Sequence, residues 1–531
     1  MGTDKAGFSM EKAGKDQWPQ WLVGLCIGSW GLRLLIAWLL PPGFDEAYYF
    51  LYTQHWDWSY FDHPVMVALT TALGPWLSGY ISPLTLRLGA LGLYGLSTAL
   101  LYLSGRRLFG PAMGMWAVAI ASLSPLFVLS FGVLAAPDNA LILGWSAVMY
   151  VAVLEFFPVD NRSHISTESP YRPTAKIVLI GLLLGLTCLS KYHGFILGLS
   201  LVGFCLTSRH HRRALVSPWA GVALLLFLTT LTPLLYWNLQ HSWLSFGFHL
   251  FTRFDDSASR PEFSVLNMLG VWLVGIAYLF PSLGLPLWWV SGRSLWQLGD
   301  LRRRFLLWLG LPIALGFTLL GGVTRIYPAW PAPGLWSLSL LLALAVAGWP
   351  LRRVKRWLVG SALVMATLLL IALGHVALGT LQRPGGVVEI LSLETDPTTT
   401  LIDVVQLRQV LKTGEARDAI AAADFLVTNE FWLSGYVDMA VSPLTSAPVM
   451  AFTQDPRGHA VWFEPVTLVG YSGLFLTIAD YDQSQIQITY APYFEKFELL
   501  QTLEIQRASA TTETFYLYDV GRLTTPYQYP Y

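Results

Sequence analysis

Four groups of ionisable residues stand beside long apolar segments of this chain and could do chemistry. They are Asp45 with Glu46 in DEAYY, Asp62 with His63 in FDHP, Asp138 in AAPDNAL and Lys191 in SKYHG. Carboxylates act as general bases or metal ligands, and a lysine beside them favours an anionic ligand such as phosphate. Together these residues predict a site that handles a phosphate ester.

Each group also has a structural interpretation. Asp138 follows a proline directly before an apolar segment, and it could cap a helix there. Asp62 precedes a His-Pro dipeptide and is equally typical of a turn. Lys191 could extend its ammonium group to the lipid headgroups. The pair Asp45 and Glu46 is the hardest to explain structurally, because the sequence shows no basic partner for it and burial of an unpaired acid is costly.

The composition requires that these groups be positioned by membrane helices. Of the 531 residues, 54% are hydrophobic and only 12% are charged, and the mean hydropathy is +0.51. The net charge of +0 gives no reason to expect a nucleic-acid partner. All three cysteines lie inside apolar runs, which argues against a disulfide framework. The first apolar run lacks a small-residue cleavage site and is interpreted as an uncleaved span.

Apolar runs bounded by charged residues, Pro or Gly predict about eleven membrane spans, within a range of about 11 to 13. The runs are 21–40, 84–104, 112–133, 139–157, 176–190, 193–208, 215–237, 265–290, 304–322, 328–349 and 357–379, with a short or re-entrant piece at 64–80. Residues 174–208 must cross twice in a stretch that is too short for two full spans. This predicts short or broken helices that place Lys191 at a polar chamber.

Lys and Arg collect in alternate loops, which predicts the orientation in the membrane. The loops assigned to the cytoplasm hold Lys5, Lys12, Lys15, Arg106, Arg107, Arg162, Arg172, Arg209, Arg212, Arg213, Arg293, Arg302, Arg303, Arg304, Arg352, Arg353, Lys355 and Arg356. The opposite loops hold the four ionisable groups, Asp255, Asp256 and Arg325, with Arg253 and Arg260 as exceptions. The candidate site is therefore expected on the extracytoplasmic face of a plasma (inner) membrane.

Residues 1–379 are predicted to form the membrane domain, and residues 380–531 a soluble α/β or α+β domain on the extracytoplasmic side. Strands are predicted at 424–428 and 485–490, and a helix at 401–412. This part of the sequence has no glycine-rich phosphate loop, nucleophile elbow or metal-spaced Cys/His cluster.

A series of segments resembles a known enzyme family. The segments are DEAYYFLYTQHWDWSYFDHP, LRLGALGLYGLSTALLYLSGRRLFG, SPLFVLSFGVLAAPDNALILGW, LSKYHGFILGL, PLLYWNLQHSWLSFGFHL and RIYPAWPAP. In order and spacing, over about residues 20–350, they are similar to the bacterial GT-C membrane glycosyltransferases, the branch of the dolichyl-phosphate-mannose protein mannosyltransferases and the lipid A aminoarabinose transferase. The resemblance implies a hexosyl or pentosyl transferase that moves a sugar from a polyprenyl-phosphate donor to an extracytoplasmic lipid, glycan or protein.

The resemblance also implies roles for individual residues. The family's first-loop acid falls on Asp45, the expected general base, with Glu46 beside it. The expected donor-phosphate residues are Lys191, Arg325 and His63, and the other expected site residues are Asp62, Asp138 and Tyr192. His63 departs from the family, because the aminoarabinose branch has a lysine at this position.

The chemistry agrees with these roles. One positioned carboxylate suffices to deprotonate an acceptor hydroxyl for a single in-line step that inverts the anomeric carbon. A divalent metal on Asp45, Glu46 or Asp138 is compatible with this step but not required. The alternative is a transporter or flippase of a lipid-linked or anionic substrate, which should show paired interrupted segments in two related halves.

Overall fold

The computed structural model describes residues 18–158, 171–250, 263–381, 396–508 and 510–531. Several residues that were used to predict the orientation lie outside these ranges. They are Lys5, Lys12, Lys15, Arg162, Arg253, Asp255, Asp256 and Arg260.

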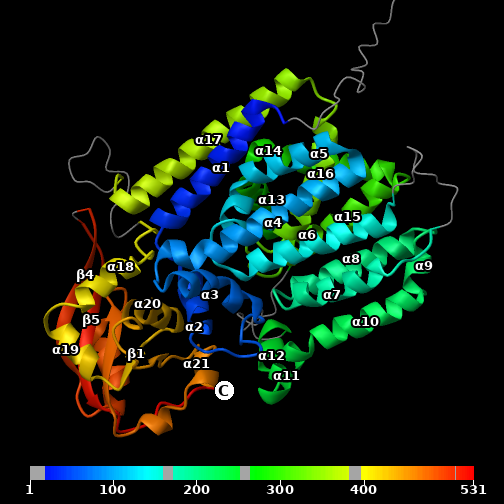
Figure 1. The fold of residues 1–531 in the computed structure, drawn as a ribbon. Helices are drawn as coiled ribbons and strands as arrows, with labels where there is room; N and C mark the ends of the chain where they lie inside the picture. Colours follow the sequence, from blue (N-terminus) through cyan, green and yellow to red (C-terminus); the bar gives the residue numbers. More distant parts are fainter. Residues whose placement is uncertain (1–17, 159–170, 251–262, 382–395, 509) are drawn as a thin grey trace, which may run out of the picture.

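The first part of the chain is a bundle of helices, and the C-terminal domain packs against one end of it (Figure 1). The helices are α1 (Gln20–Leu39), α2 (Phe44–Tyr52), α3 (Met66–Ser78), α4 (Pro83–Phe109), α5 (Pro111–Leu123), α6 (Pro137–Phe156), α7 (Lys176–Cys188), α8 (His193–Thr207), α9 (Arg212–Leu215), α10 (Pro218–Thr230), α11 (Thr232–Gln240), α12 (Leu244–Leu250), α13 (Val265–Leu279), α14 (Pro281–Ser294), α15 (Leu301–Leu320), α16 (Ala332–Val346) and α17 (Leu351–Leu378). A π-helical turn, Phe127–Phe131, follows α5.

The prediction of a polytopic helical membrane domain is confirmed. Among the described residues, α1, α4, α6, α15 and α17 are long and apolar enough to cross a membrane. Two bent pairs, α10 with α11 and α13 with the helix after it, count as broken spans or re-entrant loops. Five shorter apolar helices complete the bundle: α3, α5, α7, α8 and α16.

Two predicted continuous spans are wrong in detail, because both are broken. The run 265–290 bends by 119° where Phe280 takes a φ of +79° before Pro281. Proline has no N–H for the helix ladder and its ring clashes with the preceding turn, so the helix restarts there in a new direction. The run 215–237 bends by 43° between Thr230 and Thr232.

Two buried tryptophans join α6 to α16 in the core of the bundle. Trp145 on α6 donates its indole N–H to Ser337 Oγ at 2.8 Å, and Trp336 on α16 donates to Ser146 Oγ at 3.0 Å. Both tryptophans are fully buried. This reciprocal pair joins the two helices without leaving a buried donor unpaired.

The C-terminal domain has a five-stranded mixed sheet in the order β2-β1-β3-β5-β4. Its elements are α18 (Val404–Leu411), α19 (Gly414–Ala422), β1 (Phe425–Thr428), α20 (Phe431–Val441), β2 (Val449–Ala451), α21 (His459–Trp462), β3 (Ser472–Ile478), α22 (Gln483–Tyr490), β4 (Glu498–Arg507) and β5 (Ala510–Arg522). β1 runs parallel to β2 and β3, and β5 is antiparallel to β3 and β4. The predicted α/β or α+β class is confirmed.

One strand prediction in this domain is wrong. Residues 485–490 lie in helix α22, because the Asp482 side chain accepts hydrogen bonds from the N–H groups of Ser484 and Gln485 and caps the helix. The apolar alternation in this short segment suits either structure, and the cap favours the helix. The strand at 424–428 and the helix within 401–412 are both present as β1 and α18.

The two parts of the chain meet where α20 lies across α2. A Cβ atom on Gly435 of α20 would lie only 2.2 Å from the carbonyl oxygen of Ala47 on α2, so only glycine permits this approach. Tyr436 Oη donates to the carbonyl oxygen of Pro42 at 2.8 Å, directly before α2. The C-terminal domain therefore contacts the helix that carries Asp45 and Glu46.

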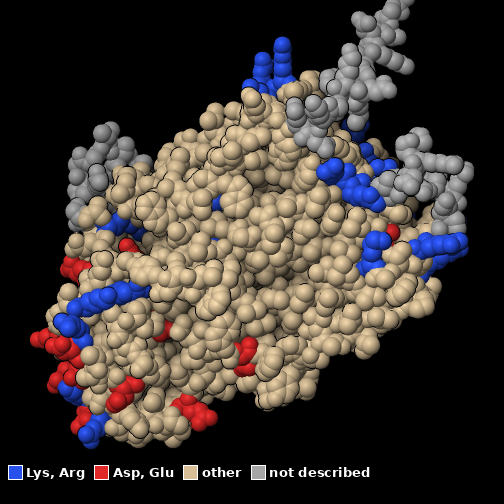
Figure 2. Space-filling view, in the orientation of Figure 1, with Lys and Arg blue, Asp and Glu red and all other residues tan. Residues whose placement is uncertain are grey.

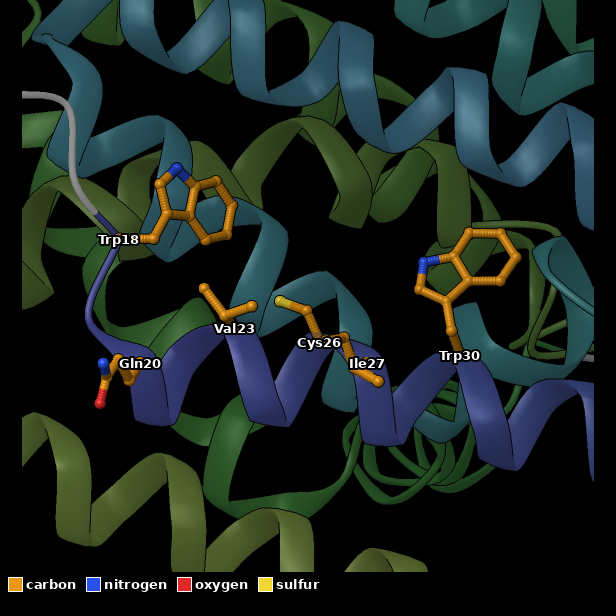
Figure 3. Close-up of a pocket in the computed structure, with 6 residues that line it drawn as sticks. All are labelled: Trp18, Gln20, Val23, Cys26, Ile27 and Trp30. Atoms are coloured by element: carbon orange, nitrogen blue, oxygen red, sulfur yellow. The ribbon is translucent and has the colours of Figure 1, made fainter.

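Two hollows in the helical bundle have no charged lining residues. One is a groove of about 660 Å³ that is lined by Trp18, just before α1, and by a stripe of α1 from Gln20 to Trp30 (Figure 3). The other is an apolar cavity of about 470 Å³ between α7, α8 and α10. Gly194, three residues after Lys191, lines this second cavity. The backbone N–H of Gly194 donates to the carbonyl oxygen of Lys191 at 3.0 Å, so this cavity begins next to a predicted site residue.

Candidate functional site

Asp45 and Glu46 lie in the first turn of α2, where the helix dipole favours acids. Glu46 is 3% exposed, and its carboxylate forms a two-pronged ion pair with Arg87 of α4, at 2.8 Å from Nε to Oε1 and 2.6 Å from Nη2 to Oε2. The backbone N–H groups of Gly43 and Ala135 donate to the same carboxylate at 3.0 and 2.8 Å. Both oxygens of Glu46 are therefore engaged by the protein itself.

Arg87 continues this clamp into the end of α1. It is fully buried and also donates to the carbonyl oxygens of Ala37, Leu40 and Pro41, at 3.2, 2.6 and 3.1 Å. The last carbonyl groups of a helix have no hydrogen-bond donors within the helix, and the guanidinium of Arg87 supplies these donors. The expectation that the acid pair has no basic partner is thus wrong for Glu46, and the clamp fixes α2 against α1 and α4.

Asp45 has a different environment from its neighbour, because successive helical residues point in different directions. Its side chain is exposed at the start of α2, whereas Glu46 is buried. The Asp45 carboxylate contributes to raising the pKa of Tyr49 and of Tyr436, so it lies within electrostatic reach of both phenols. Asp45 therefore presents a carboxylate at an accessible place beside the C-terminal domain.

Asp138 and Lys191 form a buried ion pair. Lys191 Nζ lies 3.0 and 2.9 Å from the two carboxylate oxygens of Asp138, and each side chain is 8% exposed. Asp138 is in the first turn of α6, after the cap residue Ala136, and does not cap the helix. Lys191 lies at the break between α7 and α8, as predicted, but its ammonium group turns inward. The helix-cap and headgroup interpretations of these two residues are both wrong.

Asp62 is 2% exposed and pairs with an arginine of the C-terminal domain. Arg457 Nη1 donates to Asp62 Oδ2 at 2.7 Å, and the other oxygen, Oδ1, is buried without a hydrogen bond from the described residues. His249 Nε2 of α12 donates to the Asp62 carbonyl oxygen at 2.6 Å. The ring of His63 lies 6.0 Å from that of His249. The first loop is thereby joined both to α12 and to the C-terminal domain.

Tyr192 contacts the residues around Asp62, whereas Arg325 does not do so among the described residues. The Tyr192 hydroxyl pairs with Ser245 Oγ at 2.7 Å, and its ring lies 4.9 Å from that of His249. Arg325 is exposed, and its guanidinium lies 5.3 Å from the ring of Tyr327. Tyr192 therefore belongs to the cluster, whereas no contact of Arg325 with the acids is observed among the described residues.

Tyr49 on α2 is the residue around which the predicted acids gather. It is 6% exposed, and its burial raises the pKa of its phenol well above the usual value. The carboxylates of Asp45, Asp62 and Asp138 raise this pKa further, while Arg457 lowers it. Three of the four predicted groups thus act on one phenol, and Lys191 reaches the same place through Asp138.

The described residues do not form a ready metal site. Within them, no group of three or more His, Cys, Asp or Glu side chains is placed to hold a metal ion. Of the predicted candidate ligands, Glu46 is saturated by Arg87 and backbone N–H groups, and Asp138 by Lys191. A cation bound by Glu46 or Asp138 would have to displace these partners.

Two arginines of the site were missed in the sequence. The sequence offered a signal for Arg87, which is a charged residue near the start of the predicted span 84–104. Charges within a membrane span usually have a function or a partner. Arg457 had no such signal, because it lies 395 positions from its partner Asp62 in an ordinary polar segment. Only the packing of the C-terminal domain brings it to the first loop.

The sequence of this chain is similar to those of known proteins. The family model described as dolichyl-phosphate-mannose-protein mannosyltransferase matches residues 62–237. The lipid A galacturonosyltransferase RgtD of Rhizobium johnstonii is 26% identical over 304 residues, which are 54% of this chain and 56% of RgtD. The match thus spans little more than half the length of that relative.

Two solved structures of ArnT from Cupriavidus metallidurans have the same fold. The apo structure is 15% identical with a TM-score of 0.56, and the structure bound to undecaprenyl phosphate is 16% identical with a TM-score of 0.58. Each alignment covers 94% of this chain and 97% of ArnT. The predicted fold, a multi-pass membrane domain with a C-terminal mixed-sheet domain, is confirmed, as is the resemblance that the motifs indicated.

Proposed function

We propose that this chain, which is of the GT-C glycosyltransferase type with the ArnT fold, transfers a sugar from a polyprenyl-phosphate donor to an acceptor hydroxyl. The observation that carries the proposal is the junction at Lys191. A buried cation that suits a phosphate lies three residues from Gly194, which lines an apolar cavity that suits a lipid chain. Undecaprenyl phosphate, the lipid in one ArnT structure, has these two chemical parts.

Asp45 is the proposed general base. It removes the proton from the acceptor hydroxyl while the new glycosidic bond forms and the bond from the anomeric carbon to the phosphate oxygen breaks. The exposure of Asp45 supports this assignment, because an acceptor must reach the base. One in-line displacement inverts the anomeric carbon, and polyprenyl phosphate leaves.

Lys191 is the proposed partner of the leaving phosphate. In the present state its charge is neutralised by Asp138, so a bound phosphate would share the ammonium group with that carboxylate. Negative charge that develops on the leaving group is stabilised most strongly where water is excluded, and both side chains are buried. Arg325, which is exposed, is a second proposed cation for the donor phosphate.

The apolar cavity between α7, α8 and α10 is the proposed place of the donor chain. It extends from Gly194, near Lys191, to Leu215, which follows the basic residues of α9. A chain lying there would run alongside the bundle with its phosphate at Lys191. RgtD acts on lipid A by its name, and a lipid acceptor of that class is proposed here too.

The site is proposed to face the extracytoplasmic side of the inner membrane. In Figure 2, the charged side chains at the top and right edges of the helical domain are almost all Lys and Arg, whereas Asp and Glu gather, together with further Lys and Arg, at the C-terminal domain at the lower left. This separation supports an orientation with the basic end in the cytoplasm.

The test is transfer by the purified protein in detergent or lipid nanodiscs. The wild type should consume a polyprenyl-phosphate sugar when lipid A is added and release polyprenyl phosphate. Asp45→Asn should lower turnover by roughly 10²–10⁴-fold, the usual worth of a positioned base. Asp57→Asn, in the same loop, is the control. Turnover of Asp45→Asn within a few-fold of wild type would remove Asp45 from the mechanism, and transport of an intact donor without transfer would favour the transporter.

A further inference from the structure

Arg457 has an unusual backbone conformation for its residue type. It lies in the sequence Asp455-Pro456-Arg457-Gly458 directly before α21, and its φ is +47°. Apart from glycine, asparagine and aspartate, residues rarely adopt this left-handed conformation. Glycine would adopt this backbone conformation at a lower energetic cost. The reason that arginine occupies this position therefore lies in the contacts of its side chain.

The guanidinium of Arg457 is held on several sides but is not closed off. Nη1 donates to Asp62 at 2.7 Å and Nε to Asp455 at 3.2 Å, while the group lies 4.1 Å from the ring of Phe431 and 5.7 Å from that of Phe248. The remaining nitrogen, Nη2, makes no hydrogen bond within the described residues. The side chain is 25% exposed. A ligand can therefore reach a cation that is already oriented.

The other cations of the site are less available. Arg87 is fully buried and uses both of its prongs on Glu46, and Lys191 is 8% exposed and bound to both oxygens of Asp138. Arg457 thus has the most accessible guanidinium or ammonium group among the ion pairs formed by the predicted acids.

Arg457 and His63 have neighbours in common. The His63 ring is 5.6 Å from the ring of Tyr49 and 6.0 Å from that of His249. Arg457 acts electrostatically on the same Tyr49, and its guanidinium contacts Phe248, the residue before His249. The two side chains therefore share neighbours, although they come from opposite ends of the sequence.

We propose that Arg457 supplies, from the C-terminal domain, a positive charge that binds the lipid phosphate of the donor. It would replace the charge that the first loop lacks, because this chain has His63 where the aminoarabinose branch has lysine. Histidine changes its charge near neutral pH, whereas a guanidinium stays charged and offers a planar fork to phosphate. The inference rests on the proposed function for the identity of the donor.

The test is equilibrium binding of a sugar-free polyprenyl phosphate to the full-length protein, followed by quenching of tryptophan fluorescence. Arg457→Gln should weaken binding by roughly tenfold to a hundredfold, the effect of losing a hydrogen bond to a charged group. Arg457→Lys should weaken it less, because the charge remains. Arg417→Gln, which removes an exposed arginine of α19, is the matched control and should bind like wild type. A polyprenol without phosphate should bind all four proteins equally.

A second-site rescue separates phosphate binding from a structural role. His63→Lys added to Arg457→Gln should restore most of the lost affinity, since it returns a cation to the same neighbours. Unchanged binding by Arg457→Gln overturns the inference. So does a loss without rescue in a protein that melts like wild type. If the double variant does not fold, equal losses in Arg457→Lys and Arg457→Gln overturn it.

Binding and sugar transfer, measured on the same proteins, distinguish this inference from the proposed function. A wild type that binds polyprenyl phosphate in an Arg457-dependent way but transfers no sugar would refute the proposed function and leave the phosphate site intact. A wild type that transfers sugar while Arg457→Gln binds the lipid normally would refute only the role of Arg457.

Discussion

At the scale of single residues, the DEAYY motif combines two acids in different environments. Glu46 joins α1, α2 and α4 through Arg87, and Asp45 leaves its carboxylate accessible. Glu46 is buried and Asp45 is exposed because they are one residue apart on a helix that packs against α20 and α3 and leaves its other side open. We infer that Glu46 positions α2, and with it Asp45, rather than taking part in proton transfer.

This division predicts different defects for the two acids. Glu46→Gln leaves the buried Arg87 without a counter-ion, and breaking such a pair typically costs about 3–5 kcal/mol of folding free energy. We expect a clearly lower melting temperature for Glu46→Gln and a nearly unchanged one for Asp45→Asn. Glu498→Gln, an exposed change on β4, should stay within about 0.5 kcal/mol of wild type. A Glu46→Gln protein that melts normally but does not turn over would instead assign Glu46 to the chemistry.

At the scale of elements, the short helices α7 and α8 create both the polar break and the apolar cavity. Neither helix is long enough to count as a span by itself, with 13 and 15 residues respectively. Their junction brings Lys191 inside the bundle, and both helices line the cavity beside α10. The polar group at this break is satisfied within the protein, because Lys191 pairs with Asp138.

Filling the cavity should impair the use of long donors. A Cβ atom at Gly198 of α8 would contact only Leu184, at 3.9 Å, so Gly198→Phe can enter the cavity without a backbone clash. We expect a higher KM for a long polyprenyl donor and a smaller effect for a donor with one or two isoprene units. Gly221→Phe on α10 is the matched control, because its side chain would point into open space. Equal KM values for both variants with the long donor would place the chain elsewhere.

At the scale of the whole molecule, the C-terminal domain is part of the candidate site. Its Gly435 packs against Ala47 of α2, and its Arg457 pairs with Asp62 of the first loop. The backbone N–H of Gly458 donates to Tyr48 Oη at 3.1 Å. The side chain of Trp462 stacks on His55 at 4.7 Å between ring centres. A domain held by so many contacts is expected to move with α2 as one unit.

Cysteine labelling of intact cells tests the orientation of the whole protein. In a background without Cys26, Cys188 and Cys205, an impermeant thiol reagent should label Trp56→Cys in the first loop and Thr489→Cys in the C-terminal domain. It should not label His210→Cys, beside the basic residues before α9. All three positions are exposed, so burial does not decide the outcome. Labelling of His210→Cys alone would reverse the orientation and move the site to the cytoplasm.

The sequence by itself determined the features that depend on local composition. Apolar length defined most of the helices, and the short run around Lys191 predicted the break between α7 and α8. Charge at the membrane edge selected Asp45, Glu46, Asp62, Asp138 and Lys191 as candidates. These signals are local because the bilayer acts on each segment separately: an apolar run is favoured in lipid, and a charge within it needs a reason.

The tertiary structure alone decided which charges are partners. Glu46 meets Arg87 across 41 positions, Lys191 meets Asp138 across 53, and Asp62 meets Arg457 across 395. Such pairings depend on how helices and domains pack, and no periodicity in the sequence encodes them. The same packing separated Asp45 from Glu46, because burial is a property of the neighbours that a side chain meets and not of the residue itself.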